Sequence, residues 1–286
     1  MLTNCLSIDV EGFIESNLES CPAFAEDLDK TREHYEIEKN TQTVLNILAE
    51  SEISATFFFV GRLAREIPHL VREVASAGHE IACHSYEHLR ICGIPRDQFK
   101  QKVKSAKNRL EDVSGKRVYG FRAPEFSITQ ASLWALDVLE ELGFAYDSSI
   151  YPIAMHDVYG MKDANPVVHI LPNGLIEWPL ASIDFLGVRF PFGGGGYFRL
   201  YPLRLTKLCI WAANRKRQPC MFYIHPYELG PIIPKVTNIS PYRRFRHYFH
   251  CAAGVSRLRY LLRAFSFGPA TEILTSMGFL QVESSV

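Results

Sequence analysis

Two histidines four residues apart are the first candidates for chemistry in this chain. His84 and His88 enclose the segment HSYEH, directly after the short apolar run 80–83. Imidazoles at this spacing can bind one divalent ion where the backbone is helical or tightly turned, and the alternative is a pair of surface histidines. A place at the carboxyl end of a strand favours the metal site, because active sites of β/α barrels gather there.

The nearest candidates for a third ligand are Asp9 and Glu11, which end the first apolar run in Asp9-Val10-Glu11. Two carboxylates that are two residues apart leave an extended strand on the same face. One of them could bind an ion while the other accepts a proton. Taken alone, the pair could also be two solvated acids at the end of a strand.

Two more apolar runs end in polar side chains. Arg122 follows the run 118–121 and could hold a carboxylate in place, with a surface salt bridge as the alternative. His225 closes the run 220–224, where it could act as a general acid or have a structural role. The segment Tyr146-Asp147-Ser148-Ser149 is a weaker candidate, because it could simply be a turn.

The elements that must position these residues alternate between β-rich runs and helical patterns. That alternation is typical of a parallel sheet flanked by helices and predicts an α/β fold, an irregular (β/α) barrel. Residues 231–250 are rich in proline, arginine and aromatics and predict an extended surface segment, followed by helices near 254–264 and 269–277. The expected strands cover 6–10, 55–60, 80–83, 118–121, 175–178 and 220–224, and the expected helices cover 39–51, 63–77, 96–112, 129–143 and 202–217.

The composition narrows the class of protein further. The 31 basic residues balance the 31 acidic ones, so the total charge does not predict a nucleic-acid-binding protein. No run approaches 18 apolar residues, which argues against a transmembrane segment, and the opening MLTNCLSIDVEG does not resemble a signal peptide. The seven cysteines include no CxxC pair and favour a reduced, cytoplasmic location. The oligomeric state stays open.

The motifs, taken in order, resemble those of the polysaccharide deacetylases, the NodB-homology enzymes of carbohydrate esterase family 4. More narrowly, the chain resembles the subfamily associated with bacterial exopolysaccharide biosynthesis. This resemblance runs from about residue 4 to about residue 275. It implies a NodB-type barrel over 1–230 and a C-terminal helical extension over 231–286 that packs on the barrel as one structural domain. The motifs are Asp9-x-Glu11, HSYEH at 84–88, FRAP at 121–124, YDSS at 146–149 and YIHP at 223–226.

The resemblance also implies a role for each motif residue. Many members carry adjacent aspartates in the first motif, of which the second binds the metal, whereas Val10 takes that place here. We therefore assign the ligand role to Glu11. The full assignment is Asp9 as catalytic base, Glu11, His84 and His88 as metal ligands, Arg122 as the residue that orients the base, and His225 as catalytic acid.

The implied reaction is the hydrolytic N-deacetylation of a sugar in polysaccharide or glycolipid biosynthesis. The partner would be an N-acetylated sugar that is lipid-linked, nucleotide-linked or oligomeric. Two imidazoles and a carboxylate favour Zn²⁺, and Co, Ni or Fe would suit the same ligands. The glycine run 193–196 lacks the spacing of a phosphate-binding loop and could instead let the backbone approach a sugar ring. The expected substrate-binding residues are Pro124, Trp178, Tyr197 and Phe198.

Two alternatives remain at this point. HSYEH also fits the HxxEH motif of zinc peptidases, with Glu87 as the base, but that motif requires both histidines on a helix. It would also leave Asp9, Arg122 and His225 without roles. The second alternative is a catalytically silent carbohydrate-binding barrel that has lost its metal through the change to Val10.

Overall fold

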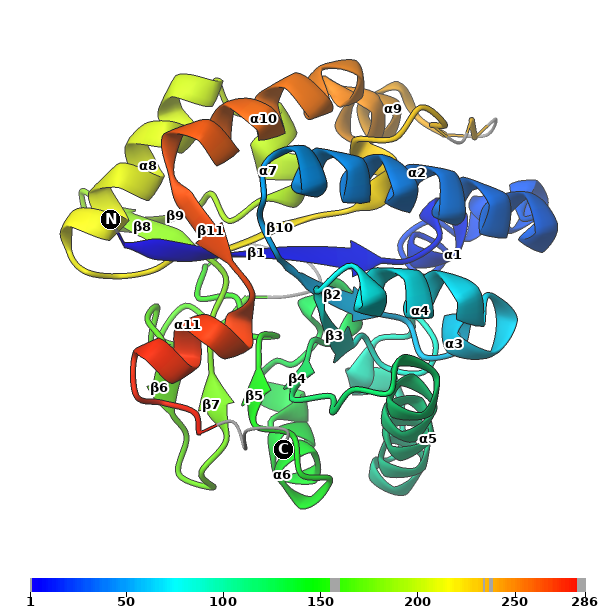
Figure 1. Ribbon diagram of the computed structural model, residues 1–286, viewed down its shortest axis with the longest axis horizontal. Coiled ribbons are helices and arrows are strands. Elements are labelled where there is room, and N and C mark those ends of the chain that lie inside the picture. The colour runs from blue at the N-terminus through cyan, green and yellow to red at the C-terminus, as the bar shows by residue number, and fades with distance from the viewer. Residues whose placement is uncertain (1, 155–159, 234, 237–238, 282–286) are drawn as a thin grey trace.

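The computed structural model describes residues 2–154, 160–233, 235–236 and 239–281. A nine-stranded sheet curls into a half-barrel around the central strand β1 (Thr3–Val10), which confirms the expected irregular barrel (Figure 1). The strand order is β10 (Met221–Ile224), β1, β2 (Thr56–Phe59), β3 (Glu80–Cys83), β4 (Gly120–Phe121), β5 (Tyr146–Asp147), β7 (Ile176–Glu177) and β6 (His169–Ile170), and β11 (Ser266–Gly268) pairs with β1. All pairings are parallel except that of β6 with β7.

The segment after β7 bridges the open side of the half-barrel. Single parallel bridges join Leu180 to Met221 and Gly194 to Tyr223, both on β10. The backbone N–H of Tyr223 donates to the carbonyl of Gly193 at 2.7 Å. Because the parallel strands point the same way, the side chains that follow β1, β3, β4 and β10 gather at one end of the sheet.

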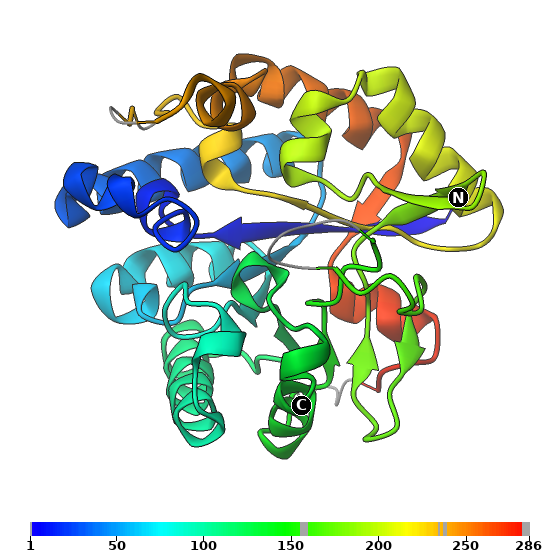
Figure 2. The same cartoon turned by 180° about the vertical axis from the view of Figure 1, so that it is seen from behind.

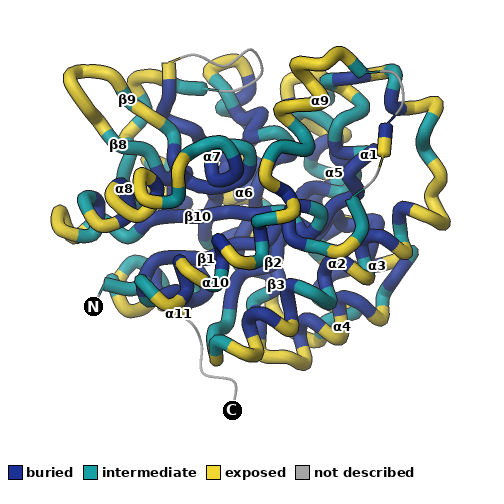
Figure 3. Tube along the Cα trace, turned by 90° about the horizontal axis from the view of Figure 1, so that it is seen from above, coloured by how far each residue is buried: buried dark blue, intermediate teal, exposed yellow. Residues whose placement is uncertain are grey.

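Helices surround the curled sheet and bury its outer face (Figures 1 and 2). The burial pattern follows from apolar strands such as β2, whose four residues are all buried, and from helices that are exposed along their outer side (Figure 3). No helix in the described part of the chain is long and apolar enough to cross a bilayer. The helices are α1 (Phe13–Ser16), α2 (Lys30–Glu50), α3 (Leu63–Glu66), α4 (Pro68–Ser76), α5 (Arg96–Ser114), α6 (Trp134–Glu141), α7 (Gly195–Leu200), α8 (Leu203–Arg215), α9 (Pro241–Tyr248), α10 (Gly254–Ala264) and α11 (Ala270–Ser276).

Two helices differ from their predicted ranges for local reasons. α2 begins at Lys30 rather than near 39, because the side chain of Asp29 accepts the backbone N–H groups of Thr31 and Arg32 and caps the helix. The helix predicted over 63–77 is divided into α3 and α4 at Pro68, which has no N–H to continue the helical ladder.

The prediction of an extended segment over 231–250 is wrong, because α9 occupies Pro241–Tyr248. Ser240 caps this helix by accepting the backbone N–H of Arg243, and Pro241 stands at its first position, where proline is favoured. Pro241 therefore marks the start of a helix in a segment that was expected to contain none. Residues 234 and 237–238 of this segment lie outside the described residues.

The C-terminal part of the chain joins the sheet directly. α10 and α11 confirm the two helices expected there, and β11 between them pairs with the first residues of β1. The division of the chain at residue 230 stays a prediction. A second sheet was not foreseen: β8 (Ser182–Phe185) and β9 (Val188–Pro191) form an antiparallel hairpin after β7.

Candidate active site

Glu11, His84 and His88 form the one cluster of potential metal ligands found among the described residues. Their ligand atoms all lie within 4.8 Å of one another. Oε2 of Glu11 is 3.1 Å from Nε2 of His84 and 2.9 Å from Nε2 of His88. All three side chains are buried, with exposed fractions of 5%, 2% and 6%. The donor set of two imidazole nitrogens and a carboxylate fits a divalent ion of the zinc type.

The pleat of β1 decides which of its residues can reach this cluster. Side chains alternate between the two faces of a strand. Val10 belongs to the apolar cluster between sheet and helices, together with Leu6 and Ile8. Asp9 and Glu11 therefore point to the opposite face, toward the site. Glu11, and not Val10, contacts the two histidines.

The two histidines lie on a tight turn and not on a helix. β3 ends at Cys83, and Ser85 adopts a left-handed conformation with φ 62°. Nδ1 of His84 lies 2.8 Å from the carbonyl of Arg122, which orients Nε2 toward Glu11. Glu87 lies 2.6 Å from Lys102 on α5. The peptidase alternative therefore lacks the helix that its motif requires.

Asp9 is held by Arg122, which is fully buried. Nη1 of Arg122 donates to Oδ1 of Asp9 at 2.5 Å and to Oγ of Ser7 at 2.9 Å. Its Nε and Nη2 donate to the carbonyl and the hydroxyl of Ser148 at 3.2 and 3.1 Å. The guanidinium carbon lies 4.1 Å from the centre of the Phe58 ring. These contacts leave the arginine, and with it the Asp9 carboxylate, little freedom to move.

The segment 146–149, a weak candidate in the sequence, supports Arg122 from behind. Ser149 Oγ accepts the backbone N–H of Ala123 at 2.8 Å and donates to Oδ1 of Asp147 at 2.6 Å. Burial raises the pKa of Asp147, although hydrogen bonds from Glu177 and Ser149 oppose the shift. Through Ser149, this carboxyl is connected to the loop after β4.

His225 lies on the other side of Glu11, with its Nε2 3.4 Å from Oε1 of that residue. Oε2 of Glu228 accepts the backbone N–H of His225 at 2.9 Å and lies 3.1 Å from its Nδ1. Oε1 of Glu228 accepts from Nε of Arg199 at 2.6 Å. The ring of Tyr227 stacks on the imidazole, with centres 4.8 Å apart.

Electrostatics favour the protonated form of His225. Burial alone would lower its pKa, but the carboxylates of Glu228 and Glu11 outweigh burial and raise the pKa to about 9. Burial alone would raise the pKa of Glu228, but Arg199 and His225 lower it to about 2. Neither Glu228 nor Arg199 was among the residues expected at the site from the sequence. The signal for Glu228 was present, because an acid three residues after His225 can reach back to it across a short turn.

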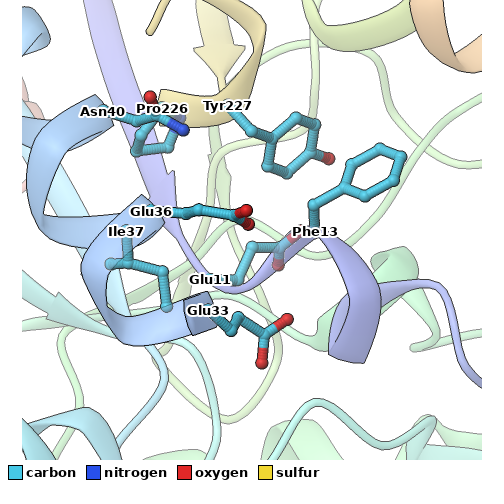
Figure 4. A pocket seen from close by; sticks show the side chains of 8 residues that line it. All are labelled: Glu11, Phe13, Glu33, Glu36, Ile37, Asn40, Pro226 and Tyr227. Carbon is cyan, nitrogen blue, oxygen red and sulfur yellow. The ribbon is translucent and has the colours of Figure 1, made fainter. Parts of the chain in front are cut away.

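A small cavity lies beside Glu11, and residues of α2 line it together with Glu11. Figure 4 shows the side chains of Glu33 and Glu36 on α2 near Glu11, with Phe13 and Tyr227 across from them. Oε1 of Glu33 accepts the backbone N–H of Glu15 at 3.0 Å. Burial raises the pKa of Glu33 to about 7. Sequence periodicity alone gave no reason to connect α2 with the metal ligands.

The four expected substrate-binding residues are placed differently from one another. Trp178 and Phe198 lie in the core, only 1% and 2% exposed, and Phe198 packs on Phe222. Neither ring is exposed enough to stack on a sugar. Tyr197 is half-buried, and Pro124 is buried in the loop after Arg122.

Two family models match consecutive parts of the chain. Residues 28–146 match the polysaccharide deacetylase family. Residues 148–275 match a family described as a domain of unknown function (DUF3473). Together the matches begin before β2 and end within α11.

Named relatives point to the same family. A peptidoglycan-N-acetylglucosamine deacetylase of Bacillus cereus is 23% identical over 158 residues, which are 50% of this chain and 56% of the relative. A chitooligosaccharide deacetylase of Azorhizobium caulinodans is 35% identical over 85 residues, 29% of this chain and 40% of the relative. The chain thus spans about half the length of the curated relatives it matches.

The fold has a close counterpart among solved structures. A protein of Mycobacterium smegmatis, described as a candidate polysaccharide deacetylase, superimposes with a TM-score of 0.63 at 20% identity. The match covers 100% of this chain and 95% of the other. At this identity the likeness shows the fold alone. Family models, relatives and fold agree with the motif resemblance, and the chain carries a polysaccharide deacetylase domain over residues 28–146, followed by a DUF3473 domain over residues 148–275.

Proposed function

We propose that this protein hydrolyses the acetamide of an N-acetylated sugar in polysaccharide or glycolipid biosynthesis. The observation that carries the proposal is the arrangement around Glu11. Its Oε2 faces the Nε2 atoms of His84 and His88, and its Oε1 lies 3.4 Å from Nε2 of His225. Potential metal ligands and a protonated acid thus converge on one point, as amide hydrolysis requires.

Glu11, His84 and His88 are the residues that would hold the metal. A divalent ion in this position would polarise the acetyl carbonyl and lower the pKa of bound water to near neutrality. We propose zinc, because two imidazoles and one carboxylate with open positions suit it, and Co, Ni or Fe would suit the same ligands. The outer hydrogen bond from His84 to the Arg122 carbonyl supports this assignment.

Asp9 would accept the proton of the attacking water. Arg122 keeps its carboxylate in one orientation, which is what a general base needs. His225 would donate a proton to the departing nitrogen, and its raised pKa keeps that proton in place near neutral pH. An amine leaves readily only when protonated, so the reaction needs both groups.

The loop after Arg122 would stabilise the oxyanion with a backbone N–H. Glu125 and Phe126 both adopt left-handed conformations, with φ 49° and 50°, which are costly for residues other than glycine. Such strain is typical of loops at functional sites. A backbone donor aimed at a developing oxyanion contributes about 3 to 4 kcal/mol.

The silent-barrel alternative has less support than the active enzyme. It depends on the loss of a ligand at Val10, but Glu11 supplies a carboxylate at the histidines. Val10 packs instead in the apolar core. We also propose a cytoplasmic location, which is supported by seven cysteines that are all unpaired, six of them buried.

Metal analysis and acetate release test this function together. Protein purified without chelators should carry about one divalent ion per chain, as three-ligand catalytic sites do. It should release acetate from at least one member of a panel of lipid-linked, nucleotide-linked and free N-acetylated sugars. Asp9→Asn is the matched control, because it keeps the shape of the side chain and removes the base. A protein that carries no metal and releases no acetate from the whole panel would support the silent barrel instead.

A further inference from the structure

The balanced total charge hides a strong segregation along the chain. Residues 185–271 contain 14 of the 31 basic residues but a single acidic residue, Glu228. Glu228 is buried and already paired with Arg199 and His225. The surface formed by this part of the chain is therefore basic, whereas the acids lie almost entirely before residue 185.

The exposed apolar side chains are concentrated in the same part of the chain. Of the twelve large apolar residues that are exposed in the described structure, ten lie between 185 and 260. The β8–β9 hairpin contributes Phe185, Leu186, Val188 and Phe190, and Leu186 at its turn is 87% exposed. Large exposed apolar groups that gather in one region mark an interaction site.

α8 combines both properties on one side. Thr206, Cys209, Ile210 and Ala213 are buried and fix the inner side of the helix. The outer side, here called the α8 face, is formed by Arg204, Leu205, Lys207, Leu208, Trp211 and Arg215, all exposed. Lys216 and Arg217 directly after the helix lie on the surface as well.

The cations on the α8 face and directly after it form no salt bridge within the described part of the chain. These cations are Arg204, Lys207, Arg215, Lys216 and Arg217. Their contacts are with aromatic rings instead: Arg215 lies 4.8 Å from the ring of Trp211, and Lys207 lies 5.5 Å from the ring of Tyr260.

The hairpin and the α8 face lie side by side. Figures 1 and 3 both show β8 and β9 beside α8, at the end of the molecule that holds the N-terminus. The hydrogen bond from Arg189 is the main cause that lowers the pKa of Asp184 on β8, and Lys216, directly after α8, contributes to the same shift. The hairpin, with its exposed apolar side chains, thus lies next to a helix whose exposed side is basic and apolar.

We propose that the α8 face and the β8–β9 hairpin dock this protein on an anionic lipid bilayer. Lysine and arginine would bind the phosphates of the headgroups. Trp211, Leu208 and the hairpin side chains would enter the boundary between headgroups and acyl chains. Helices with a basic and an apolar, tryptophan-containing side lie in the plane of a membrane in this way. Each cation near an anionic leaflet strengthens binding about fivefold, so five unpaired cations act together.

Two other occupants fit the surface less well. A second copy of this chain related by a two-fold axis would bring the unpaired cations against the same cations, and like charges repel. A nucleic acid would match the cations but would leave Leu205, Leu208 and Leu186 without an apolar partner. An anionic bilayer offers phosphates to the cations and an apolar region to the leucine and tryptophan side chains.

Vesicle sedimentation tests the proposal without reference to catalysis. The full chain is mixed at low salt with vesicles of phosphatidylcholine alone, or of phosphatidylcholine with phosphatidylglycerol. We expect sedimentation with the anionic vesicles only, reversed by high salt. The double variant Arg215→Glu/Lys216→Glu should weaken partitioning about 25-fold or more. The matched control is Lys104→Glu/Arg109→Glu on α5, where two exposed cations are also reversed, and its partitioning should change far less.

Tryptophan fluorescence provides a readout of insertion. Trp178 is buried in the core and Trp134 is half-buried, so a blue shift on adding anionic vesicles should come from the exposed Trp211. The shift should disappear in Trp211→Phe, while the circular dichroism spectrum stays unchanged. Equal binding to neutral vesicles, or none to anionic ones, would overturn the proposal. A dimer or a DNA complex that the same reversal abolishes, without vesicle binding, would assign the surface to that partner instead.

Discussion

Oε2 of Glu11 lies 2.9 Å from Nε2 of His88, and Val10 beside it faces the opposite side of β1 in the apolar core. In the first motif of this chain the metal-ligand role therefore falls, in our proposal, one residue further along than in relatives with adjacent aspartates. The longer glutamate side chain spans the extra distance, and the pleat keeps it on the same face as Asp9.

Glu11 and Asp9 should fail in different ways when changed. Glu11→Ala removes a ligand and should weaken metal affinity by more than the about 10- to 100-fold typical of an outer-shell loss. Asp9→Asn should keep the metal and lose nearly all turnover, because the amide cannot accept the proton. Competition with a coloured chelator measures the first effect, and acetate release measures the second. Equal metal loss in both variants would contradict this division of roles.

The ion pair between Arg122 and Asp9 should matter for stability as well as for catalysis. Both side chains are buried, so Arg122→Met leaves the Asp9 charge unpaired and should cost about 3 to 5 kcal/mol of the free energy of unfolding. Arg96→Met is the control, because its pair with Glu141 is exposed and should be worth at most about 1 kcal/mol. Urea unfolding of both variants measures the difference, and similar losses would contradict the argument.

The alkaline limit of activity should depend on Glu228. His225 must be protonated to act, and Glu228 is the largest influence that raises its pKa to about 9. Glu228→Gln removes that influence, so the alkaline limb of kcat/KM should move to lower pH. A cation bound at Glu11 would lower the pKa of His225 in both proteins, so the difference between them still reports the Glu228 carboxylate. Glu87→Gln, at a half-exposed pair outside the site, should leave the pH profile unchanged.

Glu33 should destabilise the protein above neutral pH. Burial raises the pKa of its carboxyl from an ordinary value of 4.5 to about 7, so the folded state holds the proton more tightly, and stability falls as pH rises from about 4.5 through 7. Glu33→Gln keeps an oxygen that can accept the N–H of Glu15 and has no charge to bury. The variant should gain about 3 kcal/mol at pH 8 and almost nothing at pH 4. Urea unfolding at both pH values checks this, and a gain of equal size at pH 4 would be contrary evidence.

Gly194 should be essential for the β-bridge that joins the segment after β7 to Tyr223 on β10. Its φ is +127°, and a Cβ there would lie 1.8 Å from the carbonyl oxygen of Tyr223. Gly194→Ala should therefore displace the strand that precedes His225, lowering the melting temperature and the turnover together. Gly196→Ala is the control, since its Cβ would meet no atom closer than 3.9 Å. Equal melting temperatures in the two variants would show that the bridge is dispensable.

The sequence by itself determined six strands of the large sheet, the family resemblance and the chemical types of the residues at the end of that sheet. Asp9, Glu11, His84, Arg122 and His225 each follow an apolar run, and the carboxyl ends of parallel strands meet at one edge. Their convergence was therefore predictable from the order of local patterns. Hydrophobic periodicity and apolar segments are local properties of the sequence. They predict the strands correctly because each central strand of the sheet must have apolar side chains to be buried.

Only the tertiary structure decided how remote groups are combined. Glu228 and Arg199 fix the charge of His225, Glu33 approaches Glu11 from α2, and Trp178 is buried instead of lining a groove. The α8 face likewise depends on tertiary packing, because the packing of the inner side of α8 against the rest of the protein decides which of its side chains stay exposed. The physical reason is that the burial and pairing of a side chain depend on which distant segment packs against it, and no local pattern records that choice.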